Sequence, residues 1–124
     1  MLWLAIAAGG ALGSLARHGT NIAVHRAFGE SVPYATATVN VVGCLLIGAL
    51  AGAVTSGHLR LTETARAFAF VGVLGGFTTF SSLGLDTFTL LRAGALAAAL
   101  GNVAVQFGVG LASVFLGYRL VTSL

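Results

Sequence analysis

The sequence predicts an all-α integral membrane protein with four transmembrane helices, the third of them broken. Of its 124 residues, 57% are hydrophobic and 7% are charged, with a mean hydropathy of +1.00, whereas soluble domains carry about 25% charged residues. Four apolar segments cover residues 2–24, 34–56, 65–91 and 95–121. Each is long enough to cross a hydrocarbon core, which requires about 20 helical residues. Because short connections join them, residues 1–124 are expected to form a single four-helix transmembrane domain.

The first segment carries "GGALGSLAR", a glycine spacing typical of closely packed membrane helices. Its arginine, Arg17, lies deeper than the end of a span requires, and we expect it to cap helix ends or to supply positive potential near a pore mouth. The three histidines, His18, His25 and His58, show no metal-ligand spacing with Cys, Asp or Glu. They are interpreted as interfacial residues.

The arginines are almost evenly divided between the two sides of the membrane. With four spans, both termini and the connection between the second and third segments share one side. That side carries Arg60, Arg66 and Arg119, and the other carries Arg26 and Arg92, with Arg17 in the first span. Because arginine and lysine excess in short loops sets orientation, this balance predicts dual topology and an antiparallel dimer. The alternative is that one residue fixes a single orientation.

The second segment contains Asn40, whose amide must find partners because lipid offers none. Two interpretations stay open for it: an interhelical hydrogen bond that holds the helices together, or a donor that lines an ion pathway. Cys44 lies in the same segment and, as the only cysteine, allows no intramolecular disulfide.

The third segment is interrupted by "GGFTTFSS" at residues 75–82. Paired glycines weaken the helical ladder, and Thr and Ser hydroxyls can satisfy the backbone groups that a break would free. Irregular backbone at membrane depth persists only when it is buried in protein or lines a cavity, and freed carbonyls there can coordinate a small cation. The stretch therefore predicts a helix break beside a functional site. An unbroken helix with small packing residues is the alternative.

The fourth segment spaces Asn102, Gln106 and Gly110 four residues apart, which places them on one helix face. This stripe either packs helices or, with Asn40, supplies uncharged donors to a pathway. A cation or proton pathway would be expected to bury a carboxylate, and none lies deep in the first two segments. Amide and hydroxyl hydrogens and the positive edges of aromatic rings suit a small anion instead.

Other classes of function have little support in the sequence. The net charge of +3 is carried by scattered arginines without a basic cluster, so a nucleic-acid partner is not expected. No nucleophile, base and orienting group are arranged as an enzyme would require.

Over nearly its whole length the chain resembles the Fluc/CrcB family of fluoride channels. "GGALGSLAR" is similar to that family's GGxxGxxxR signature in the first helix, and "TATVNVVGCLLIG" to its TxxxNxxGxxxxG pattern in the second. "GGFTTFSS" is similar to the GGxTTFS break of the third helix. The resemblance implies a passive fluoride exporter of the bacterial or archaeal plasma membrane. Its antiparallel dimer, of two copies or of this chain with a homologous subunit, would hold two pores and one central sodium ion.

The resemblance also implies roles for individual residues. Main-chain carbonyls of Gly75 and Thr78 would bind sodium, Asn40 would donate to fluoride, and the ring edge of Phe80 would face the ion. Ser82, Asn102 and Gln106 match polar positions that line the family's pore. Arg17 matches the arginine of its first helix, and Asp86 matches the acidic residue that follows its break.

Three positions depart from the family pattern. Leu83 stands where a second phenylalanine is usual, so the pore is expected either to have a single ring or to take its second ring from a homologous subunit. Asp86 replaces a glutamate that is longer by one methylene, and Asn102 and Gln106 replace a tyrosine and a serine. The competing interpretations are a small dual-topology multidrug exporter, which needs a carboxylate in its first span, and a non-transporting scaffold whose polar residues only pack helices.

Overall fold

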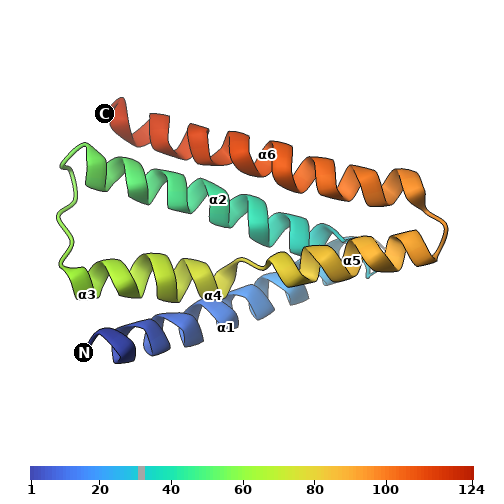
Figure 1. The fold of residues 1–124 in the computed structure, drawn as a ribbon, viewed down its shortest axis with the longest axis horizontal. Helices are drawn as coiled ribbons and strands as arrows, with labels where there is room; N and C mark the ends of the chain where they lie inside the picture. Colours follow the sequence, from blue (N-terminus) through green and yellow to red (C-terminus); the bar gives the residue numbers. More distant parts are fainter. Residues whose placement is uncertain (31–32) are drawn as a thin grey trace.

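The computed structural model describes residues 1–30 and 33–124, and every regular element in these residues is helical. Three helices are long and unbroken: α1 (Leu2–Phe28), α2 (Tyr34–Thr55) and α6 (Leu96–Thr122). The third apolar segment is divided into α3 (Glu63–Arg66), the π-helix η1 (Ala67–Leu74), α4 (Gly75–Phe77) and α5 (Phe80–Arg92), which follow one another along one line (Figure 1). The predicted all-α membrane fold with a broken third helix is therefore confirmed.

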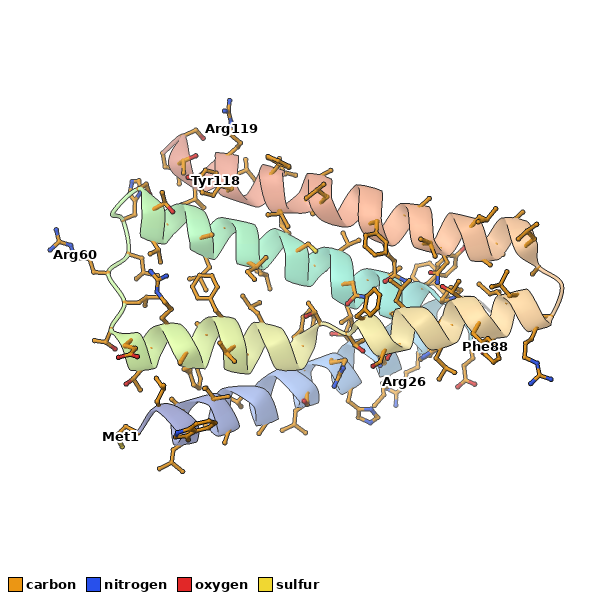
Figure 2. All side chains as sticks on the ribbon, viewed as in Figure 1. Met1, Arg26, Arg60, Phe88, Tyr118 and Arg119 are labelled. Carbon is orange, nitrogen blue, oxygen red and sulfur yellow. The ribbon has the colours of Figure 1, made fainter. Side chains whose placement is uncertain are left out.

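The helices all run along the long axis of the molecule, and both termini lie at the same end as the α2–α3 connection (Figure 1). The α5–α6 connection lies at the opposite end, and α1 ends and α2 begins on that side of the molecule (Figure 1). Arg60 and Arg119 point outward at the end that holds the termini, whereas Arg26 lies toward the other end (Figure 2). The division of arginines that the four-segment order predicts is thus present in the fold.

Among the described residues, three helical segments are long and apolar enough to cross a membrane, namely Tyr34–Thr55, Glu63–Arg92 and Leu96–Thr122, and α1 is not one of them. The first helix has 27 residues, which gives it a length of about 40 Å. It is less apolar than the others because its second half carries Arg17, His18, His25 and Arg26. Large apolar side chains are exposed along the bundle, as a surface in contact with lipid requires.

Glycines let the first helix approach the third segment closely. Gly9 and Gly13 are buried, and a Cβ added to Gly9 would lie 2.5 Å from the carbonyl oxygen of Phe68. From the facing side, a Cβ on Gly76 would lie 2.7 Å from the carbonyl oxygen of Gly10. The glycine spacing in the first segment therefore serves helix packing, as the sequence predicts.

A second glycine-rich seam joins α2 to α6, and these two helices run in the same direction (Figure 1). A Cβ on Gly48 would collide with the Val114 carbonyl, and a Cβ on Gly117 would collide with the Leu45 carbonyl. A Cβ on Gly52 would lie 2.8 Å from the carbonyl oxygen of Tyr118. The seam holds α6 beside α2 over most of its length and so fixes which α6 side chains face the break.

The break lies between Phe77 and Phe80. Thr78 and Thr79 leave the helical conformation, with φ/ψ of −78°/159° and −153°/117°. Immediately before it, η1 is a π-helix of eight residues, a feature that the sequence did not predict. π-Helical turns are rare and often mark functional sites, so the irregular backbone is longer than "GGFTTFSS" alone suggested.

Candidate functional site

The Asn40 side chain binds the peptide groups that the break exposes. Its Oδ1 accepts from the main-chain N–H of Thr79 at 2.8 Å, and its Nδ2 donates to the Thr79 carbonyl at 3.0 Å. The second Nδ2 hydrogen bond goes to Oε1 of Gln106 at 2.6 Å. The carboxamide thus gives the Thr79 N–H the acceptor that a continuous helix would have provided, and it adds a donor to the Thr79 carbonyl. Asn40 therefore makes hydrogen bonds between helices, as the first interpretation expected, and both of its amide hydrogens are engaged by protein acceptors.

Hydroxyl groups satisfy much of the remaining backbone at the break. Thr79 is the N-cap of α5, and its Oγ1 accepts from the N–H of Ser82 at 3.2 Å and donates to the Ser82 hydroxyl at 3.1 Å. The Thr78 hydroxyl donates to the Leu74 carbonyl at 3.0 Å, which closes the last turn before the break. Ser82 therefore belongs to the cap of α5. The predicted role of Thr and Ser hydroxyls at this break is confirmed.

Carbonyls of the last turn before the break lose their regular helical donors, those of Gly75 and Thr78 among them. In a continuous helix the N–H of Thr79 would donate to the carbonyl of Gly75, but it donates to Asn40. Likewise the N–H of Ser82, the regular donor for the Thr78 carbonyl, donates to the Thr79 hydroxyl. The family resemblance assigns these two carbonyls, out of the several freed by the break, to sodium. Main-chain oxygens freed in this way are the type of ligand that unwound membrane helices offer to a small monovalent cation.

A chain of side-chain hydrogen bonds extends from Asn40 along α6. Gln106 Nε2 donates to Asn102 Oδ1 at 2.9 Å, and Asn102 Nδ2 donates to the Thr87 hydroxyl on α5 at 3.0 Å. Asn102 and Gln106 are only 8% and 6% exposed. The predicted stripe faces inward, since Gly110 is buried with them. Thr87 was not singled out from the sequence, although it lies on α5 eight residues after the N-cap, Thr79.

A cavity of about 550 Å³ lies beside the break, and none of the described residues that line it is charged. Its polar lining comes from uncharged side chains, and its apolar lining comes from rings and aliphatic groups of α2, the third segment and α6. The lining residues used below are Asn40, Gly75, Thr78, Thr79, Phe80, Leu83, Gln106 and Phe107. An uncharged lining with hydrogen-bond donors suits an ion that must bind and leave again.

Phe80 pairs with Phe107 at the cavity. Their ring centroids are 6.4 Å apart at an interplanar angle of 82°, an edge-to-face arrangement. Phe80 is 75% exposed and Phe107 57% exposed, so in a single chain the cavity is open at this side. Leu83 is buried beside them. Phe107 was missed from the sequence, although it directly follows Gln106.

Arg17 and Asp86 lie away from this cavity. Arg17 is half-buried on α1 and is not among the cavity's lining residues. Asp86 lines a second cavity of about 180 Å³ at the junction of α1, α2 and α5, together with Asn21, His25, Glu30 and Thr36. The structure therefore brings Asn40, Phe80, Gln106, Gly75 and Thr78 to one cavity, with Ser82 and Asn102 bonded to its lining. It leaves Arg17 and Asp86 outside.

The chain matches a known family over most of its length. The family model described as "CrcB-like protein, Camphor Resistance (CrcB)" matches residues 4–118. The relative named "Fluoride-specific ion channel FluC" from Rhodospirillum centenum is 44% identical over 119 residues, which are 95% of this chain and 93% of that protein. Its namesake from Thermus thermophilus is 45% identical over 118 residues, which are 95% of this chain and 93% of that protein.

A third relative, "Fluoride-specific ion channel FluC 2" from Symbiobacterium thermophilum, is 45% identical over 116 residues, which are 93% of each chain. The names of all three describe ion channels and not enzymes, in agreement with the sequence interpretation. With its apolar spans and these bacterial relatives, the chain is a multi-pass plasma-membrane protein. It belongs to the CrcB family, as the three motifs indicated.

Proposed function

We propose that the protein is a fluoride-selective ion channel that exports fluoride passively from the cytoplasm. The observation that carries this proposal is the cavity beside the break, which combines amide and hydroxyl groups with aromatic rings and has no charged residue in its lining. The names of the relatives support fluoride as the ion.

The polar groups provide a route for the anion, which can replace the side-chain acceptors of their amide hydrogens one after another. Asn40 gives one amide hydrogen to Gln106, and this side-chain bond is the one that an arriving anion can replace without disturbing the Thr79 peptide. Gln106 and Asn102 each use one amide hydrogen in the chain and carry a second. A small anion can thus move between donors along α6 while the break keeps its shape. Because no fixed positive charge lines the cavity, the anion is also released readily.

The aromatic rings complete the same route. Phe80 presents its ring at the open side of the cavity, where the positive edge of an aromatic ring attracts an anion. Fluoride is favoured over chloride because closely spaced donors in a narrow, dry passage suit the smaller ion.

The functional unit is an antiparallel dimer with two pores, formed by two copies of this chain or by this chain and a homologous subunit. Two observations support pairing: the arginines are balanced between the two ends, and the cavity is open where Phe80 and Phe107 are exposed. A second subunit across that face would enclose the cavity and bury both rings. A twofold axis in the membrane plane would give each subunit an equivalent pore.

A sodium ion at the centre of the dimer would be held by the carbonyls of Gly75 and Thr78. Both residues line the cavity, and the regular helical donors of both carbonyls are diverted to side chains. A bound sodium ion would offset the repulsion between carbonyl dipoles brought together at the crossing. The residues present fit this ligand, because hard cations prefer oxygen atoms.

The direct test is fluoride efflux from liposomes that contain purified protein and sodium. We expect fluoride to leave far faster than from protein-free liposomes and chloride to be retained. Efflux at the protein-free rate would contradict the proposed function. Proton-coupled transport of a cationic dye would support a multidrug exporter, and no transport together with tolerance of Asn40→Leu would support a scaffold.

Pairing and the cation are tested separately from flux. Purified protein in detergent should have the mass of a dimer, and a cysteine added at one terminus should be labelled from both sides of the membrane. A monomer, or labelling from one side only, would contradict the antiparallel pair. Replacing sodium by a large organic cation should slow fluoride efflux, and unchanged efflux would remove sodium from the proposal.

A further inference from the structure

The chain of hydrogen bonds that starts at the break also returns to the same helix. It runs from the Thr79 peptide to Asn40, then through Gln106 and Asn102 to Thr87 on α5. The Thr87 hydroxyl donates in turn to the Leu83 carbonyl at 2.7 Å. Both ends are therefore main-chain groups of α5 or of its N-cap, and the chain ties the start of α5 to α2 and α6.

From the Thr79 N–H to the Leu83 carbonyl, each group in this chain donates to the next, and the one hydrogen bond that runs backward is from Asn40 Nδ2 to the Thr79 carbonyl. The Thr79 N–H must donate, so it sets the Asn40 oxygen toward itself and turns the Asn40 amide toward Gln106. Gln106 then presents its oxygen to Asn40 and its amide to the oxygen of Asn102. Each carboxamide that accepts a hydrogen bond becomes a better donor, so the one-way order strengthens the remaining amide hydrogens of Gln106 and Asn102.

Thr87 fits the far end of this chain because a hydroxyl can accept and donate at once. It accepts from Asn102 Nδ2 and passes its own hydrogen to the Leu83 carbonyl. Without this acceptor the Asn102 amide, which belongs to a residue only 8% exposed, would have to turn to find another partner. A turned Asn102 would no longer offer its oxygen to Gln106 in the same geometry.

We propose that Thr87 is a positioning residue for anion conduction, which fixes the Asn102 and Gln106 carboxamides with their donor hydrogens in place along α6. This inference rests on the proposed fluoride channel. Thr87 does not line the main cavity, but through Asn102 it sets the orientation of Gln106, which does.

The test compares Thr87→Val, which keeps the branched shape and removes the hydroxyl, with Thr87→Ser, which keeps the hydroxyl. The matched control is Thr89→Val, because Thr89 makes the same hydrogen bond to the carbonyl four residues earlier, at 2.9 Å, but is exposed. We expect fluoride efflux to fall about fivefold or more in Thr87→Val. Thr87→Ser and Thr89→Val should keep wild-type efflux. Equal efflux in Thr87→Val and Thr89→Val would overturn the proposal.

A second readout does not depend on transport. NMR spectra of the side-chain amides should show the Asn102 and Gln106 resonances shifted in Thr87→Val and unchanged in Thr89→Val. If wild-type protein carries no fluoride, the channel function fails, while this comparison still decides whether Thr87 orients the carboxamides. Unshifted Asn102 and Gln106 resonances in Thr87→Val would overturn the positioning role by themselves.

Discussion

The seam between α2 and α6 has four layers, and its two ends differ in chemistry. Asn40 meets Gln106, Cys44 lies at Gly110, Gly48 meets Val114 and Gly52 meets Tyr118, so each layer is four residues beyond the last on both helices. At the glycine end the backbones of the two helices contact each other directly. At the carboxamide end the side chains bond to each other and to the broken third helix. The same pair of helices thus provides close backbone packing at one end and hydrogen-bonding side chains at the other.

This difference indicates that the glycine contacts help to position the carboxamide side chains, although they lie one or more layers away from them. Parallel helices that are in register at Gly48 and Gly52 must also be in register one and two layers away. Gln106 therefore reaches Asn40 because the glycine layers set how α6 lies along α2. Substitutions in each layer should separate the two contributions.

The largest effect is expected from Asn40→Leu at the carboxamide end. The Thr79 N–H, the Thr79 carbonyl and Gln106 would each lose a partner, and each buried polar group left unsatisfied costs about 1–3 kcal/mol. The free energy of unfolding in detergent should fall by about 3 kcal/mol or more, with loss of fluoride efflux.

Asn21→Leu on α1 is the matched control, because Asn21 Oδ1 is buried without a partner among the described residues. It should change stability by less than about 1 kcal/mol. Similar losses in both variants would contradict the special position of Asn40.

The second largest effect is expected from Gly48→Ala at the glycine end. The added Cβ meets the Val114 carbonyl, so the two helices must move apart, at a cost of about 1–3 kcal/mol. Thermal unfolding followed by circular dichroism measures the loss. Gly108→Ala on α6 provides the comparison, because no atom lies within 4 Å of its added Cβ. It should be neutral or stabilising by up to about 1 kcal/mol, and equal unfolding temperatures in the two variants would contradict the seam.

A smaller effect on stability, but a clear one on transport, is expected from Phe80→Ile. The ring is 75% exposed in the chain, so its loss should leave folding of the chain nearly unchanged. Fluoride efflux should fall about tenfold, because the positive ring edge is gone. Phe115→Ile on α6, at 64% exposure, should keep wild-type efflux. If both variants are equally slow, the ring at Phe80 has no special role.

The smallest effect is expected from Cys44→Ala in the layer between the two ends. The thiol is half-buried and free, and a Cβ on Gly110 would lie 3.4 Å from its sulfur, so removing the thiol leaves only a small gap. Stability should change by less than about 1 kcal/mol, and efflux should be unchanged. A large loss of efflux in liposomes would mean that the polar site extends one layer further than the hydrogen bonds do.

Much of the fold was predictable because membrane helices obey few constraints. Length and hydropathy predicted the four segments, and "GGFTTFSS" predicted the break, since freed backbone groups need nearby hydroxyls. The helix of the first segment extends four residues beyond the predicted end, to Phe28, because polar residues near a membrane surface can continue a helix that hydropathy no longer marks. The π-helix before the break was not predicted, because its residues are ordinary helix formers in an apolar run.

Most residues of the candidate site were predicted from the sequence, but the hydrogen bonds that join them were not. Asn40, Gln106 and Asn102 were chosen as polar residues in apolar spans, and all three lie in one hydrogen-bonded chain. Thr87 and Phe107 were missed, because a threonine and a phenylalanine in a membrane helix carry no signal until their neighbours are known. Asp86 was grouped with the site by resemblance, and the structure places it in the second cavity.

The sequence by itself determined that the chain is a helical membrane protein with a polar interruption in its third span, because hydropathy and glycine placement act locally. Only the tertiary structure decided that Asn40 binds the Thr79 peptide and that Thr87 ends the carboxamide chain. Those contacts join residues 39 and 15 positions apart. They depend on how closely glycines let the helices approach, which is a property of packed backbones and not of any one segment.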